Sequence, residues 1–130
     1  MTIRFDRVPY GNSQAKEFLN EAAKRTPGEK NSLDEILNGG DVYLISDAEP
    51  IGATYIEYSD IGYGEMLNIV LLASKPGTKN LWRDEYKKFI RDLMADRNIR
   101  YLCVIGRNGW DSIFPELKSV GTIYIADVFP

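Results

Sequence analysis

Hydrophobic positions along the chain follow two periods, and the changes between them predict its elements. Apolar residues at alternate positions or in short continuous runs predict strands at 2–8, 42–45, 51–58, 65–72, 101–105 and 122–129. Apolar residues three and four positions apart predict helices at 13–25, at 78–96 and from about 110 to a stop at Gly121. Asn12 or Ser13 can cap the first of these helices, and Asn98 should end the second. Between the first helix and the second strand, Ser32-Leu33-Asp34-Glu35 matches a capping box and predicts a short helix that ends at Gly39-Gly40.

The order of these elements, β-α-α-β-β-β-α-β-α-β, contains no repeat and no linker. It predicts one α/β domain over residues 1–130, with a twisted mixed central sheet and helices on both faces. The strands at 65–72 and 101–105 are the most continuously apolar, so we expect them to be parallel neighbours at the centre of the sheet.

The long helix at 78–96 has one apolar face, which we expect to pack on the sheet. That face carries Trp82, Tyr86, Phe89, Ile90, Leu93 and Met94. A stripe of cations recurs every fourth residue and should face water or a partner: Lys79, Arg83, Lys87 and Arg91.

Composition excludes several kinds of chemistry. The chain has no histidine and a single cysteine, Cys103, which excludes His-based triads and argues against a transition-metal site. Carboxylates could still bind magnesium or calcium, but the D-x-[DN]-x-[DN]-G loop is absent, and we expect no metal. Cys103 lies in an apolar strand and is expected to be an inert core thiol. Phosphate-binding glycine loops and the G-x-S-x-G motif are absent. With no apolar run long enough for a membrane span and no signal-peptide pattern at the start, we expect a cytoplasmic protein.

Charge is unevenly distributed along the chain. The net charge of −3 argues against general nucleic-acid binding. Residues 75–100 nevertheless carry eight basic and four acidic side chains, a local charge of +4 that leaves −7 for the rest. This segment is either a solvated helix face or a surface that meets an anion.

The element order resembles the GNAT superfamily of acyl-CoA-dependent N-acetyltransferases over essentially the whole chain. In that family a buried strand runs into an (R/Q)-x-x-G-x-(G/A) loop and a long helix whose start holds the coenzyme A pyrophosphate. Here residues 67–72 lead into the helix through Ser74-Lys75-Pro76-Gly77-Thr78-Lys79. The resemblance implies that coenzyme A, if bound, contacts Leu71, Leu72, Ser74, Lys75, Gly77, Thr78, Lys79 and Asn108.

Three positions depart from the family pattern. Ser74 stands where the family has Arg or Gln, and Lys79 stands where it has a small residue that lets the helix approach the phosphates. Leu117 occupies the place of the tyrosine that protonates the leaving thiolate. The resemblance leaves Glu57 and Glu65, one on each of two neighbouring strands, as candidate general bases.

These departures favour a catalytically degenerate protein, similar in character to small acetyltransferase-like proteins of tailed phages. It would act in virion assembly or as an accessory binding component, with no cofactor and with another protein, virion components or itself as partner. Tyr55, Tyr58 and Tyr63 cluster where the family binds acceptors and are expected to offer an interaction surface. The alternative is an active acetyl-CoA-dependent N-acetyltransferase acting on a small or protein amine.

Overall fold

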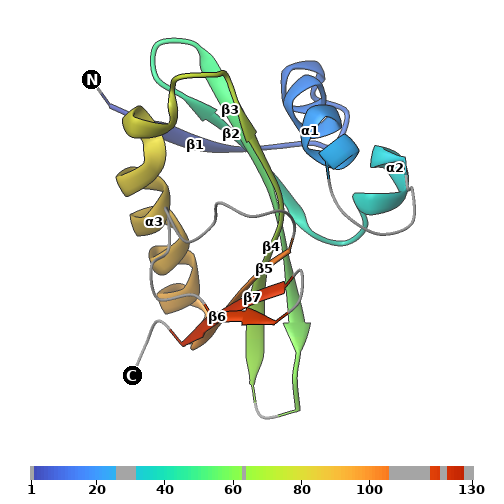
Figure 1. The fold of residues 1–130 in the computed structure, drawn as a ribbon, viewed down its shortest axis with the longest axis vertical. Coiled ribbons are helices and arrows are strands. Elements are labelled where there is room, and N and C mark those ends of the chain that lie inside the picture. Colours follow the sequence, from blue (N-terminus) through green and yellow to red (C-terminus); the bar gives the residue numbers. More distant parts are fainter. Residues whose placement is uncertain (1, 26–31, 63, 106–117, 121–122, 128–130) are drawn as a thin grey trace.

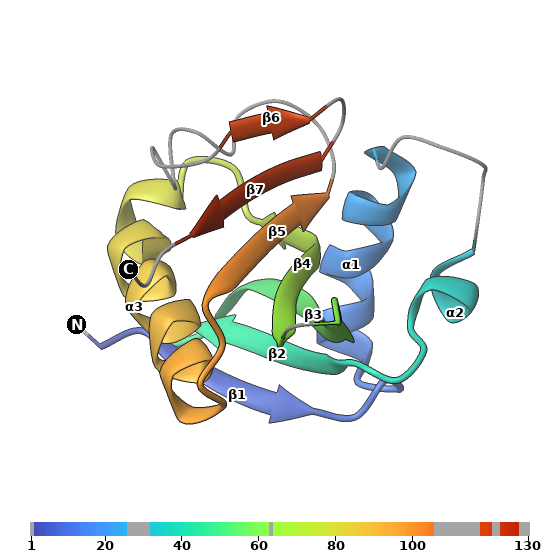
Figure 2. The same ribbon diagram turned by 90° about the horizontal axis from the view of Figure 1, so that it is seen from below.

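A seven-stranded mixed sheet runs through the molecule and carries helices on both faces (Figures 1 and 2). The computed structural model describes residues 2–25, 32–62, 64–105, 118–120 and 123–127. The strands are β1 (Arg4–Val8), β2 (Asp41–Ser46), β3 (Pro50–Asp60), β4 (Glu65–Ser74), β5 (Tyr101–Ile105), β6 (Lys118–Val120) and β7 (Ile123–Asp127). The helices are α1 (Ser13–Arg25), α2 (Leu33–Ile36) and α3 (Lys79–Asp96).

The described strands lie in the order β1-β2-β3-β4-β5-β7-β6, and of the pairs that they form only β4–β5 is parallel. The predicted fold class is confirmed, and so is the position of the two most apolar strands. β4 and β5 are adjacent, and neither is at an edge of the sheet. The crossover through α3 makes the two strands parallel, and α3 covers one face of the sheet.

Each face of the sheet has its own hydrophobic core. The α3 core lies between α3 and the sheet and contains Ile56, Leu67, Ile69, Trp82, Tyr86 and Ile90 among others. The α1 core lies on the opposite face and includes Ala15, Leu19, Leu44, Ala53, Tyr55 and Leu71. In Figure 2 the sheet separates α3 from α1 and α2, so side chains on neighbouring positions of a strand enter different cores.

The local start and stop signals work as the sequence predicts. The side chain of Asn12 accepts a hydrogen bond from the amide of Ala15 at 2.9 Å and caps α1. Ser32 and Glu35 form the capping box of α2. Asn98 follows α3 with φ +55°, the left-handed conformation that ends helices and that asparagine tolerates.

Two expectations need correction. Residues 118–120, expected at the end of a helix that stops at Gly121, form the edge strand β6 and pair with β7. The rest of that predicted helix, residues 110–117, lies outside the described residues. On α3, Trp82 is buried as expected, whereas Phe89 and Leu93 are only partly buried at the border of the α3 core.

Within the described part of the chain, none of the helices is long and apolar enough to cross a membrane.

Candidate functional site

A β-bulge interrupts β4 in the middle of the sheet. Tyr55 of β3 pairs with Leu71, but the next residue, Ile56, pairs with Ile69, so Val70 is an extra residue in β4. The bulge changes the face on which β4 side chains lie. Leu67 and Ile69 enter the α3 core, and Leu71, two residues further on, enters the α1 core.

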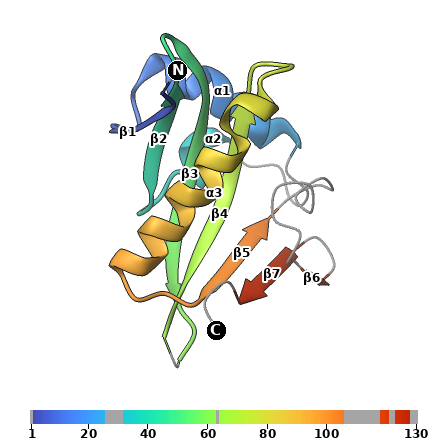
Figure 3. The same cartoon turned by 90° about the vertical axis from the view of Figure 1, so that its left-hand side faces the viewer.

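Parallel pairing between β4 and β5 ends at the same point. The last pair is Ile69 with Val104, although β4 continues beside β3 as far as Ser74 and β5 continues beside β7 to Ile105. Figure 3 shows the two strands close together near their beginnings and separating toward their carboxyl ends. We call residues 70–74 the diverging segment of β4. Among the described residues, no strand pairs with its β5 side.

The diverging segment leads through a tight turn into α3. The amide of Thr78 donates to the carbonyl of Lys75 at 3.3 Å, with Pro76 and Gly77 between them. Gly77 has φ +80°, and Pro followed by a residue with positive φ is the sequence of a type II turn. The backbone conformation at position 77 therefore favours glycine.

The beginning of α3 has no side-chain cap. The hydroxyl of Thr78 donates to the Lys75 carbonyl at 2.6 Å and makes no capping bond, and the first turn contains no acidic residue. The amide of Leu81 donates to the carbonyl of Thr78 at 2.8 Å. The helix dipole makes this end of α3 attractive to anions. Lys75 and Lys79 are exposed beside it.

Most residues that the resemblance assigns to coenzyme A therefore lie along one path, from the bulge through the turn to α3. Leu71 is buried, Leu72, Ser74 and Thr78 are half-buried, and Gly77 is exposed. Asn108 and Leu117 lie outside the described residues. The fit is by backbone: among the described residues no strand pairs with the β5 side of the diverging segment, and no side chain caps the start of α3.

Glu57 is held by a buried tyrosine. The hydroxyl of Tyr55 donates a hydrogen bond to Oε2 of Glu57 at 2.7 Å. It accepts hydrogen bonds from the backbone amides of Asn38, at 2.8 Å, and Gly40, at 3.1 Å. Burial raises the pKa of Tyr55, and the adjacent Glu57 carboxylate raises it further. Tyr55 thus remains a neutral donor and fixes the carboxylate of Glu57.

Gly40 allows the segment after α2 to lie directly on β3. A Cβ at this position would clash with the carbonyl of Ile56, and it would come within 2.8 Å of Cγ of Glu57 and of the Tyr55 ring. Glu57 pairs with Asn68, two residues before the bulge, and Glu57 and Leu71 both lie on the α1 side of the sheet. The structure therefore brings Glu57 near the diverging segment.

Glu65, the other candidate base, lies at the first residue of β4, far from the diverging segment at the last. Its Oε2 forms a 3.0 Å ion pair with Arg97, and the guanidinium of Arg97 stacks over the ring of Tyr58 at 3.8 Å. Burial raises the pKa of Tyr58 to about 12.

The expected tyrosine surface is not formed as predicted. Tyr55 is fully buried in the α1 core and Tyr58 is half-buried beneath Arg97, while Tyr63 lies outside the described residues. The expectation for Cys103 is consistent with its environment, because it is buried and burial raises the pKa of its thiol.

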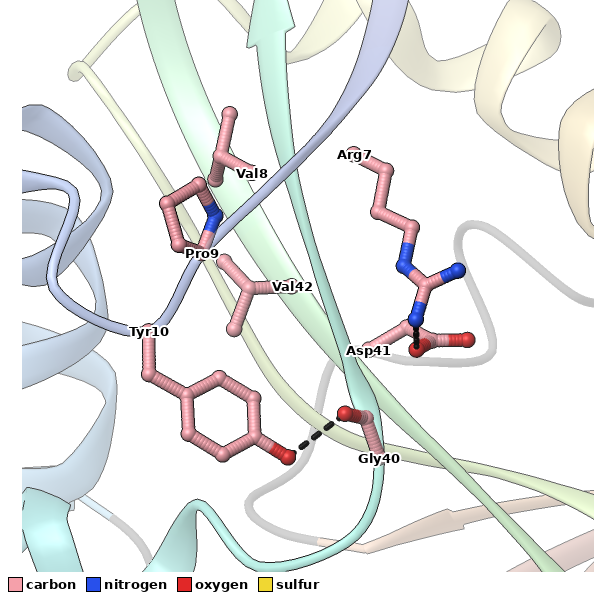
Figure 4. Close-up of a pocket in the computed structure, with 7 residues that line it drawn as sticks. All are labelled: Arg7, Val8, Pro9, Tyr10, Gly40, Asp41 and Val42. Carbon is pink, nitrogen blue, oxygen red and sulfur yellow. Dashed lines mark hydrogen bonds and ion pairs between the residues drawn. The ribbon is translucent and has the colours of Figure 1, made fainter.

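A hollow of about 560 Å³ lies where β1 ends beside the start of β2 (Figure 4). The polar side chains that line it are already paired. Arg7 forms a 2.8 Å ion pair with Asp41, and the hydroxyl of Tyr10 donates to the carbonyl of Gly40 at 2.6 Å. The described residues also contain no group of three or more acidic or cysteine side chains that could hold a metal ion.

No family model matches the sequence, and no curated protein matches it either. Solved structures do match. A chain of the NatC complex bound to Gag peptide and CoA superposes with a TM-score of 0.69 at 11% identity, covering 99% of this chain and 100% of that one. Tetrahymena GCN5 gives 0.66 at 15% identity over 98% and 97%. A Bacillus subtilis acetyltransferase in complex with CoA gives 0.66 at 14% identity over 98% and 100%.

At these identities the matches establish the fold. The chain has the fold of the GNAT acetyltransferases over 98–99% of its length, as the element order suggested.

Proposed function

We propose that the protein binds an acyl-coenzyme A along the diverging segment of β4 and the start of α3, and transfers the acyl group to an amine. The observation that carries the proposal is the bulge at Val70, with the loss of β4–β5 pairing beyond it. Interrupting two parallel strands in the middle of a sheet removes ladder hydrogen bonds, and bulges of this kind occur next to functional sites.

The chain's own groups suit a long anionic ligand. Backbone groups of the diverging segment that face away from β3 would hold the chain of the ligand, and the turn ending at Thr78 would place phosphates at the start of α3. Lys75 and Lys79 would supply positive charge to the phosphates. The charge of Lys79 would compensate for the small residue that, in the family, lets the helix backbone come close to the phosphates. The bound acyl-CoA would supply an activated thioester.

Glu57 is the proposed general base. The bond from Tyr55 holds its carboxylate on the α1 side of the sheet, two pairs from the bulge, where it would accept a proton from an amine directly or through a water molecule. Glu65 is less suited, because it is engaged by Arg97 at the opposite end of β4.

A second candidate function is favoured by one feature of the sequence. Leu117, where the family has its proton-donating tyrosine, cannot protonate a leaving thiolate. The fold would then serve as a non-catalytic component of an assembly, of the kind tailed phages use, and the α3 start with its cations would recognise an acidic group of a partner protein.

An amine screen that follows release of free thiol from acetyl-CoA tests the first candidate. With an accepted amine, Glu57→Gln should lower kcat by roughly 10²–10⁴-fold and leave acetyl-CoA affinity unchanged. Glu65→Gln is the matched control and should retain turnover. Turnover that survives in Glu57→Gln and disappears in Glu65→Gln would reverse the assignment, and no turnover with any amine would favour the second candidate.

The second candidate is tested with charge reversals on α3. Lys79→Glu combined with Arg83→Glu should weaken association with an acidic partner and reduce its sensitivity to salt. Lys88→Glu changes the charge of an exposed residue further along the same helix and is the control. Equal effects of the two changes would exclude recognition at the start of α3.

A further inference from the structure

Two buried hydroxyl groups meet a backbone carbonyl directly after the bulge. Thr54 of β3 donates from Oγ1 to the carbonyl of Leu71 at 3.0 Å, and the hydroxyl of Tyr86 from α3 lies 2.8 Å from the same Oγ1. Thr54 and Tyr86 are both fully buried. A threonine hydroxyl has one proton, so Tyr86 must be the donor to Thr54. We call this the hydroxyl chain, from Tyr86 through Thr54 to the Leu71 carbonyl.

The hydroxyl chain shows in which direction the peptide group between Leu71 and Leu72 points. The structure has no cis peptide bond among the described residues, so the amide of Leu72 points away from the carbonyl of Leu71. That carbonyl is turned toward Thr54 on the β3 side of β4. The Leu72 amide is therefore directed toward the side from which β5 has separated.

Burial makes the hydroxyl chain rigid. Hydrogen bonds in series strengthen one another, and a buried partner that loses its bond is left without water to replace it. Burial also raises the pKa of Tyr86, which keeps its hydroxyl protonated and able to donate. Tyr86 further packs edge-to-face on Trp82 at 5.7 Å, so α3 holds the phenol in place.

We propose that Thr54 and Tyr86 are positioning residues, which fix the Leu71–Leu72 peptide so that its amide is presented as a hydrogen-bond donor to the ligand that occupies the diverging segment. The proposal rests on the proposed function only for the identity of that ligand, an acyl-CoA. The hydroxyl chain itself can be tested without any ligand.

Hydrogen exchange of backbone amides is the direct test. Thr54→Val keeps the shape of the side chain and removes the donor, and Tyr86→Phe keeps the ring and removes the first hydroxyl. Each should speed exchange in residues 70–74 by roughly three- to tenfold relative to residues 66–69 of the same strand. Thr54→Ser keeps a hydroxyl and should restore slow exchange. Tyr43→Phe removes a phenol hydroxyl from the same face of the sheet. It should leave the ratio of exchange rates between residues 70–74 and residues 66–69 unchanged.

Coenzyme A affinity, measured by calorimetry under conditions where all variants are folded, is the second readout. Thr54→Val should weaken binding by roughly tenfold, and Thr54→Ser should restore it. The positioning role would be overturned if exchange became uniformly faster along β4. It would also be overturned if the ratio of exchange rates between residues 70–74 and 66–69 were the same in Thr54→Val as in Tyr43→Phe, since either result indicates a general contribution to stability. If wild-type protein does not bind coenzyme A while the exchange ratio changes as expected, the proposed function fails and the hydroxyl chain stands.

Discussion

Replacing Tyr55 with phenylalanine tests how Glu57 is held. The ring is fully buried in the α1 core and keeps its packing in the variant, so only the hydroxyl is lost. That hydroxyl accepts hydrogen bonds from the amides of Asn38 and Gly40, at 2.8 and 3.1 Å, and donates one to Glu57 at 2.7 Å.

The magnitude follows from those three bonds. An amide that loses its acceptor costs about 1–2 kcal/mol when it is buried, but Asn38 is exposed and its amide recovers part of this from water. The bond to a carboxylate contributes about 1 kcal/mol or more. Tyr55→Phe should therefore lower the free energy of unfolding by about 2–3 kcal/mol.

Urea unfolding followed by circular dichroism measures this loss as a lower midpoint with an unchanged slope. Tyr10→Phe is the matched control, since it removes one exposed bond to the carbonyl of Gly40 and should cost less than about 1 kcal/mol. Equal losses in the two variants would refute the reasoning that the Tyr55 hydroxyl organises the segment between α2 and β2. Glu57-dependent turnover should also fall in Tyr55→Phe, since the carboxylate loses its anchor.

Three further predictions concern the fold around the site. Phe89→Ala should lower the free energy of unfolding in urea by about 2–4 kcal/mol, because the ring of Phe89 stacks on Phe5 with centroids 4.4 Å apart. Leu81→Ala, at an exposed position of the same helix, is the control and should cost less than about 1 kcal/mol. Gly77→Ala should lower the free energy of unfolding by about 1 kcal/mol and weaken coenzyme A binding, because alanine is strained at φ +80°. A variant with unchanged stability and unchanged affinity would contradict the assigned turn. The raised pKa of Tyr58, about 12, means that the folded state retains a proton that the unfolded state releases above pH of about 10. Stability to urea should thus fall as pH rises from about 10 to 12, and a flat profile there would contradict this burial.

Local signals in the sequence predicted the elements well because they act over few residues. The caps at Asn12 and Ser32 and the stop at Asn98 are each determined by hydrogen bonds or backbone conformation within one helical turn. The apolar runs of β4 and β5 also predicted their central, parallel positions, because a strand covered on both faces needs apolar side chains at every position.

The bulge could not be predicted from the same run. Residues 69–72 are all apolar, so a change of face between Ile69 and Leu71 leaves no trace in the hydrophobic pattern. The strand β6 was missed for a related reason, since three residues between a helical pattern and a glycine carry too little periodicity to indicate a strand.

The candidate site depends on contacts that are distant in sequence. The predicted interaction surface at Tyr55 was wrong because its hydroxyl finds amides 15 and 17 residues away, which allows a tyrosine to be fully buried. The bond between Thr54 and Tyr86 spans 32 residues and has no local signature. The loop of residues 74–79 was predicted from its resemblance to a family motif, and its turn and helix start are where that motif implies.

Titration of the protein with coenzyme A, with backbone amide shifts recorded alongside calorimetry, tests the central claim most directly. We expect micromolar binding, with the largest shifts in residues 70–79 and only small shifts around the hollow between β1 and β2. Absence of binding at millimolar coenzyme A, or shifts confined to residues outside the diverging segment and the start of α3, would contradict the proposed site.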